Sequence, residues 1–77
     1  MKENVKYKLH PHGTDDWTGY FENNLYYENG TENSVVLAGR VEKNLFYYAG
    51  RAEPAGTIEN LKLIRIRDGF TFELKEQ

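Results

Sequence analysis

Cysteine is absent from this chain of 77 residues. Its absence excludes disulfide bonds, zinc sites built from thiolates, and a cysteine nucleophile. A domain of this size is near the lower limit for a self-sufficient hydrophobic core, and small domains often depend on disulfides, metals or partner subunits. We therefore expect stability from a well-packed core or from self-association, and we favour some self-association.

Long apolar segments are also missing. The first eight residues contain no apolar stretch that resembles a signal peptide, and no segment approaches the roughly 20 apolar residues of a membrane span. Asn29-Gly30-Thr31 fits a glycosylation sequon, but without a secretory signal we interpret it as a turn. These features predict a single domain, residues 1–77, that is cytoplasmic and does not enter a membrane.

Helical periodicity is absent as well. Tyr, Phe, Val, Ile and Thr dominate the apolar segments, and Asn and Gly separate them, which is typical of strands joined by turns. We therefore predict an all-β fold. The expected strands are Val5–Leu9, Trp17–Phe21, Leu25–Glu28, Ser34–Val41, Leu45–Ala49, Leu61–Arg67 and Phe70–Lys75.

One phrase occurs three times, as TGYFENNL (18–25), AGRVEKNL (38–45) and AGTIENL (55–61). Repeated units of this kind stack because one copy cannot bury its apolar face alone. The phrase predicts a threefold internal repeat with units at about 17–36, 37–53 and 54–75. The expected architecture is an antiparallel meander of hairpins that forms a small barrel or an extended repeat sheet.

Within each unit the phrase predicts a hairpin. A three-residue loop at 22–24 would place Phe21 opposite Leu25 and Gly19 opposite Tyr27, because residues paired across two strands share a face. The second copy would likewise pair Val41 with Leu45 and Gly39 with Tyr47. The third copy is one residue shorter, and a loop of Glu59 and Asn60 would pair Ile58 with Leu61 and Gly56 with Leu63. In each hairpin a large side chain would then lie over the bare backbone of a glycine.

The last hairpin has its own expected register. A three-residue loop at 67–69, with Gly69 left-handed, would pair Ile66 with Phe70 and Ile64 with Phe72. Leu61 and Leu63 would then be out of phase with these residues. A β-bulge near Leu63, or burial of the strand on both faces, would resolve this conflict.

Residues 17–24 resemble the opening of a MORN repeat. In that family an aromatic residue is followed by a glycine, a second aromatic and a polar turn, and Trp17, Gly19, Phe21 and Asn23 match these positions. The second copy retains Gly39. The third retains only Gly56 and Asn60, and the returning Gly-x-Gly element is missing from all copies. The resemblance implies an extended sheet that serves as a scaffold for protein contacts and has no catalytic residues.

Residues suited to catalysis or metal binding are few. Ser34 is the only serine and has no neighbouring base, and the repeated glutamates fall in hairpin loops. His10 and His12 are the only histidines, and a nitrogen-rich metal site would need both. Pro11 and Gly13 indicate a surface loop there instead. We therefore predict no enzymatic activity, no cofactor and no metal site.

Aromatic and arginine residues are the stronger indication of function. In the expected register Tyr20 and Tyr26 face outward, as do Arg40, Phe46 and Tyr48. Such a face suits a protein interface, or the stacking of bases beside arginines that contact phosphate. The other interpretation is that this face packs against a second sheet or subunit. The predicted binding residues are Tyr20, Tyr26, Arg40, Phe46, Tyr48, Arg51, Arg65 and Arg67.

The net charge of −2 argues against general duplex binding. Acidic residues are concentrated in 15–32 and basic residues in 40–67, a gradient that would orient a partner or align two copies. We expect a non-enzymatic module that binds a partner protein and can form a homo-oligomer, in the manner of phage- or plasmid-borne inhibitors. The alternatives are a nucleotide or single-stranded nucleic-acid binder and a structural subunit of a larger assembly.

Overall fold

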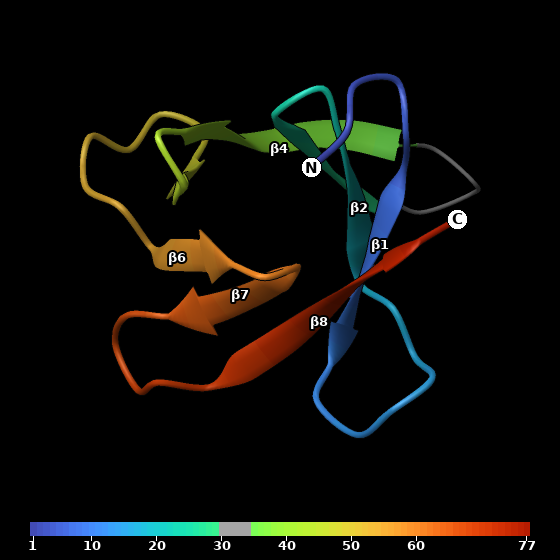
Figure 1. Cartoon of the computed structure of the whole chain (residues 1–77). Coiled ribbons are helices and arrows are strands. Elements are labelled where there is room, and N and C mark those ends of the chain that lie inside the picture. Colours follow the sequence, from blue (N-terminus) through green and yellow to red (C-terminus); the bar gives the residue numbers. More distant parts are fainter. Residues whose placement is uncertain (30–34) are drawn as a thin grey trace.

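Eight antiparallel strands close into a small barrel in the computed structural model, which describes residues 1–29 and 35–77. No helix is present in these residues, so none is long and apolar enough to cross a membrane. Figure 1 shows the strands winding in chain order around a common interior. The strands are β1 (Tyr7–Pro11), β2 (Gly19–Glu22), β3 (Leu25–Asn29), β4 (Val35–Glu42), β5 (Leu45–Tyr48), β6 (Gly56–Glu59), β7 (Lys62–Arg65) and β8 (Thr71–Glu76).

Each strand pairs with its neighbour in the sequence, and β1 pairs with β8 to close the barrel. The predicted all-β meander of hairpins is thus confirmed, in the barrel form. An extended sheet, which the MORN resemblance implied, is not formed. The structure adds one strand to those expected, Gly56–Glu59, while the threefold repeat of the sequence stays a prediction.

The ladders of residue pairs that join neighbouring strands, here called the seams of the barrel, differ in length. The ladder between β1 and β8 has five residue pairs, from Tyr7↔Glu76 to Pro11↔Phe72. The ladder between β5 and β6 has only two, Leu45↔Thr57 and Phe46↔Gly56. The barrel is therefore held most weakly, in terms of strand pairing, between β5 and β6.

The three hairpins of the repeated phrase all have two-residue turns, where three-residue loops were expected in the first two and a turn of Glu59 and Asn60 in the third. Both residues of each turn have positive φ: 52° and 66° at Asn23 and Asn24, 51° and 63° at Lys43 and Asn44, and 50° and 59° at Asn60 and Leu61. This is the conformation of a type I′ turn, whose twist matches that of the flanking strands. The predicted three-residue loops were therefore wrong. The third turn has the predicted length of two residues but lies one residue later, so Ile58 pairs with Leu63 instead of Leu61, and Gly56 pairs with Arg65 instead of Leu63.

The shorter turns move the first two pairings by one residue, and the side chains of the returning strands change face. Phe21 is paired with Tyr26, and Val41 with Phe46. Tyr26 and Phe46, predicted to face outward, are therefore buried at 3% and 2% exposure. Tyr27 and Tyr47, predicted to face inward, lie on the outside of the barrel.

A large side chain does lie over a glycine in each hairpin. In the third hairpin it is the predicted Leu63, whereas in the first two it is the residue before the predicted tyrosine. A Cβ atom added to Gly39 would lie 2.8 Å from the Phe46 ring, and one added to Gly56 would lie 2.7 Å from Leu63 Cδ1. Gly19 has the same relation to the Tyr26 ring. The glycines therefore make room for the side chains that fill the barrel.

The last hairpin also differs from its prediction. Gly69 is left-handed as expected, with φ of 72°, but Ile64 pairs with Thr71 and not with Phe72. Leu63 instead pairs with Phe72 and lies in the core, so neither a bulge nor two-sided burial is needed. Ile66 is 54% exposed because β7 ends before it, at Arg65.

The core occupies the interior of the barrel. It consists of side chains from seven of the strands, namely Tyr7, Leu9, Phe21, Tyr26, Phe46, Ile58, Leu63 and Leu74.

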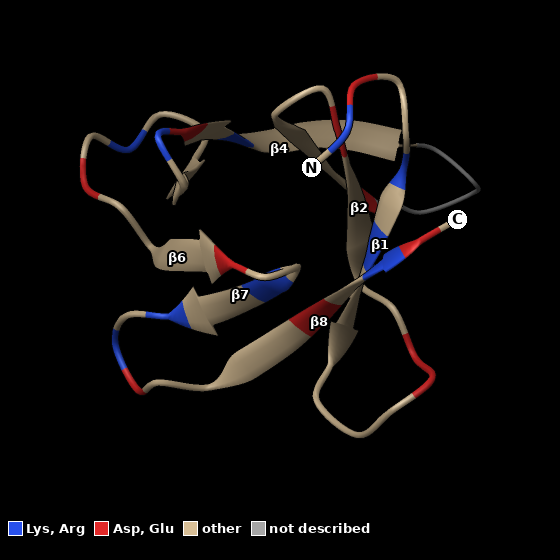
Figure 2. Ribbon diagram, viewed as in Figure 1, with Lys and Arg blue, Asp and Glu red and all other residues tan. Residues whose placement is uncertain are grey.

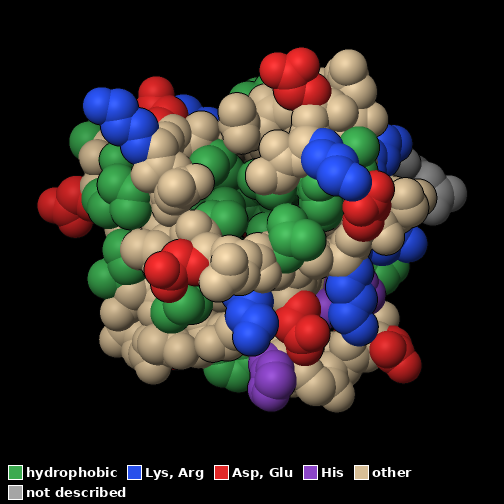
Figure 3. Space-filling model, viewed as in Figure 1, with side chains coloured by type: hydrophobic (Ala, Val, Ile, Leu, Met, Phe, Trp, Pro, Cys, Tyr) green, Lys and Arg blue, Asp and Glu red, His purple; other side chains and the backbone are tan. Residues whose placement is uncertain are grey.

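Charged residues of both signs are interspersed around the strands and loops (Figure 2), so the acidic and basic segments of the sequence do not form separate faces in that view. Figure 3 shows apolar side chains gathered in the middle of one face, with charged side chains around them.

Candidate functional site

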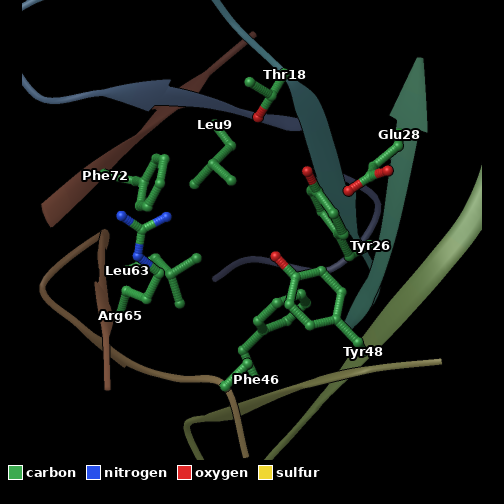
Figure 4. Close-up of a pocket in the computed structure, with 10 residues that line it drawn as sticks. Leu9, Thr18, Tyr26, Glu28, Phe46, Tyr48, Leu63, Arg65 and Phe72 are labelled. Carbon is green, nitrogen blue, oxygen red and sulfur yellow. The ribbon is translucent and has the colours of Figure 1, made fainter. Parts of the chain in front are cut away.

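A pocket of about 320 Å³ opens at one end of the barrel. Its lining includes Thr18 and Glu28 at one side and Ala55, Arg65 and Phe72 at the other. These residues lie at the strand ends that are farthest from the three type I′ turns, so the pocket is the mouth of the barrel at the end opposite these turns. We call it the mouth pocket (Figure 4).

Aromatic rings form one wall of the mouth pocket. Phe46 contacts Tyr26 and Tyr48 edge to face, with ring centroids 5.3 Å and 4.9 Å apart. Leu9 and Leu63 add aliphatic surface. Apolar pockets with a few polar groups, located in the mouths of β-barrels, are typical binding sites for small ligands.

Polar groups converge on this apolar surface. Figure 4 shows the hydroxyls of Tyr26 and Tyr48 directed into the pocket, with Thr18 and the Glu28 carboxylate near the Tyr26 hydroxyl. Burial raises the pKa of Tyr26 from 10.0 to about 12; a hydrogen bond with Thr18 opposes this shift, and the Glu28 carboxylate adds to it. Tyr26 thus remains a neutral phenol that can donate or accept a hydrogen bond.

Arg65 lies on the opposite side of the mouth pocket and is held in place by Asp68. Its Nε donates to Asp68 Oδ1 at 2.9 Å and its Nη2 donates to Oδ2 at 2.7 Å. The guanidinium also lies 5.3 Å from the Phe70 ring centroid and 5.5 Å from that of Phe72. The hydrogen bonds from Arg65, together with one from the Phe70 amide, lower the pKa of Asp68 to about 2, so the pair remains ionised.

A second group of aromatic residues lies on the outside of the barrel, across β2 to β5. Tyr20 and Tyr27 are stacked with centroids 5.1 Å apart, Leu37 is paired with Tyr27, and the Arg40 guanidinium lies 4.6 Å from the centroid of Tyr47. We call Tyr20, Tyr27, Leu37, Arg40 and Tyr47 the outer aromatic row. Its residues are exposed or half-buried and belong to adjacent strands.

The predicted binding residues are divided between these regions. The mouth pocket contains Tyr26, Phe46, Tyr48 and Arg65, whereas Tyr20 and Arg40 belong to the outer aromatic row. Arg51 and Arg67 are exposed in the loops that follow β5 and β7, outside both groups.

Tyr27 and Tyr47 of the outer aromatic row were not among the predicted binding residues. Neither were Thr18, Glu28 and Phe72 of the mouth pocket. Recognition of Asn23-Asn24 and Lys43-Asn44 as type I′ turns would have placed both tyrosines on the outside.

The histidines lie apart from both groups. His10 belongs to β1 and is buried, so the predicted surface loop was wrong for this residue, because β1 continues as far as Pro11. His12 is exposed, and its Nδ1 lies 3.3 Å from Glu73 Oε1. Within residues 1–29 and 35–77 no three His, Cys, Asp or Glu side chains are grouped as metal ligands.

Comparisons with protein-family models, curated proteins and solved structures found no match to this chain. The functional argument therefore depends on the chemistry of the mouth pocket and of the outer aromatic row.

Proposed function

We propose that this protein is a non-enzymatic binding module that engages a partner protein through the outer aromatic row. The observation that carries the proposal is the continuous apolar surface from the stacked Tyr20 and Tyr27 to Leu37, which is 52% exposed. Val35, 49% exposed, extends this surface along β4. Contiguous apolar surface of this kind marks interaction sites more often than isolated exposed residues do.

The chemistry of the row also suits a protein partner. Tyrosine and arginine are enriched among the residues that dominate binding energy at protein interfaces. Arg40 covers one face of Tyr47 and also forms an ion pair with Glu42 at 3.3 Å, which limits the motion of its guanidinium. Side chains that are ordered before binding lose less entropy when a partner docks. An inhibitor of the phage- or plasmid-borne type would use such a surface to cover its target.

Site-specific photocrosslinking tests this proposal. A benzophenone amino acid placed at Tyr27 should form a covalent adduct with a protein from a lysate of the source cells, and Tyr47 should give the same adduct. Ile64 provides the matched control, because it is half-buried and faces outward from β7 on another part of the barrel. Equal crosslinking from Ile64, or none from Tyr27 and Tyr47, would overturn the proposal.

A second candidate function is binding of single-stranded nucleic acid by the same surface. Lys6 lies 5.1 Å from the centroid of Tyr20, and Lys8 lies 4.7 Å from that of Trp17, so cations accompany the exposed rings. Bases stack on aromatic rings while basic side chains contact phosphate. This function predicts that affinity for a short oligonucleotide falls steeply with added salt. Absence of binding at low salt would eliminate it.

A further inference from the structure

We propose that the mouth pocket binds an organic cation, with an ammonium group placed between the aromatic wall and the Glu28 carboxylate. This site is distinct from the outer aromatic row, and its ligand class does not follow from the proposed protein interface. Three features of the pocket carry the inference: its charge balance, its aromatic wall and its size.

The charge balance favours a positively charged ligand. The positive charge of Arg65 is balanced by the negative charge of Asp68, to which it donates two hydrogen bonds. Glu28 is on the other side of the pocket, and no ion pair to it is formed among residues 1–29 and 35–77. The lining contains one charge of each sign, Glu28 and Arg65. Because Asp68 outside the lining balances Arg65, the negative charge of Glu28 is left uncompensated and attracts a cation.

The aromatic wall supplies the second feature. Tyr26, Phe46 and Tyr48 line the same side of the pocket, and Tyr48, which is 46% exposed, is the most accessible of the three rings, whereas Tyr26 and Phe46 are buried. A cation over the face of an aromatic ring is attracted by the electron-rich π system, and groups of such rings recognise quaternary ammonium ligands. Figure 4 shows Glu28 beside this wall, where its carboxylate would complete the surroundings of the cation.

The size of the pocket and the ion pair of Arg65 make other ligand classes less suitable. A volume of about 320 Å³ is at the small end of the range for ligand pockets, and suits a small cation more than a dinucleotide. Arg65 is the only cation of the lining, and Asp68 already occupies its Nε and one Nη2 proton. A phosphate or carboxylate ligand would also meet the uncompensated charge of Glu28.

Titration with choline tests the charge requirement. Choline should shift the NMR signals of Glu28, Tyr26 and Tyr48, with a dissociation constant at least about fivefold lower than that of 3,3-dimethyl-1-butanol, its uncharged isostere. Acetate should not shift these signals. Equal affinity for the uncharged isostere would overturn the proposal, as would the absence of any shift at the mouth pocket.

Two variants and one control identify the groups responsible. Glu28→Gln and Tyr48→Leu should each weaken choline binding by about fivefold, because each removes one attraction for the cation. Both side chains are exposed, so folding should be retained and is verified by the melting temperature. Glu22→Gln removes the same charge from the outer face of β2 and should leave choline affinity unchanged. Equal effects of Glu22→Gln and Glu28→Gln would contradict the assigned site.

The same assay distinguishes the possible sources of the cation. A short peptide that contains one trimethyllysine presents the same ammonium group as choline. Tighter binding of the peptide would assign the cation to a modified lysine of a protein, whereas tighter binding of choline would assign it to a small molecule. In both cases Glu28→Gln and Tyr48→Leu should weaken binding of the ligand, as they weaken binding of choline.

Discussion

At the scale of single residues, Arg65 shapes the entrance of the barrel. It is the last residue of β7, faces the mouth pocket, and is fixed by two hydrogen bonds to Asp68. Asp68 also accepts a hydrogen bond from the Phe70 amide at 3.1 Å, which ties the guanidinium to the turn that precedes β8. The position of the Arg65 guanidinium therefore depends on the carboxylate of Asp68, which lies in an exposed loop.

We expect the pair to make stability dependent on acidic pH. The pKa of Asp68 is about 2 in the folded protein, against an ordinary value of 3.8. A lowered pKa contributes stability that is fully present above about pH 4 and is lost as the pH falls toward 2. Urea denaturation between pH 6 and pH 2 should therefore show a smaller loss of unfolding free energy for Asp68→Asn than for the unmodified protein.

The control for this measurement is Asp16→Asn, which removes an exposed carboxylate from the loop between β1 and β2. Its stability should decrease with acid in parallel with that of the unmodified protein. If the unfolding free energy of Asp68→Asn falls with acid as much as that of the unmodified protein, the pair with Arg65 does not stabilise the fold.

At the scale of elements, the turns determine which side chains fill the barrel. Asn24 and Asn44 tolerate the left-handed conformation, because asparagine adopts positive φ more readily than most residues. Leu61 has φ of 59° in the equivalent position, where a leucine is strained. The third turn is thus the least favourable of the three.

Replacement of Leu61 should relieve this strain. Leu61→Gly creates an Asn-Gly turn, the preferred sequence for type I′, and should stabilise the protein by roughly 0.5–1 kcal/mol. The urea midpoint measures this change. Asn44→Gly is the matched substitution in the second turn and should change stability less. A lower midpoint for Leu61→Gly would mean that the leucine side chain contributes more through its contacts than its backbone costs.

The sequence alone was sufficient for seven of the eight strands and for their meander order, because their alternation and the intervening Asn and Gly residues are local signals. It was not sufficient for the register. A three-residue loop and a two-residue turn both place an asparagine at positive φ, and both leave an apolar face for the core. Phe46 and Tyr47 are each suited to burial, so the choice depends on which ring fits over Gly39 inside a closed barrel. The mouth pocket depends on that closure and was not predictable.

At the scale of the whole molecule, the barrel is closed by ladders of unequal length. Five residue pairs join β1 to β8, and two pairs join β5 to β6. Self-association, which was expected from the small size of the chain, stays a prediction. Native mass spectrometry would detect a self-associated form as a species whose mass is a defined multiple of 9.0 kDa.

Hydrogen exchange should reveal the short seam. The amides of Ala55 and Ile58 donate across it, to the carbonyls of Phe46 and Asn44 at 2.7 Å and 2.9 Å. Because few contacts resist local opening there, these two amides should exchange faster than the amides that join β1 to β8. Two-dimensional NMR after dilution into deuterated buffer measures both sets. Slower exchange of Ala55 and Ile58 would show that the loop after β5 stabilises the seam.

The order of the strands also has a consequence for the folding pathway. All pairings except one join strands that are consecutive in the chain, so hairpin formation is local and fast. The remaining pairing brings together residues as distant as Tyr7 and Glu76, and it carries the largest entropy of loop closure. We therefore expect the rate-limiting step to be the meeting of the two ends of the chain.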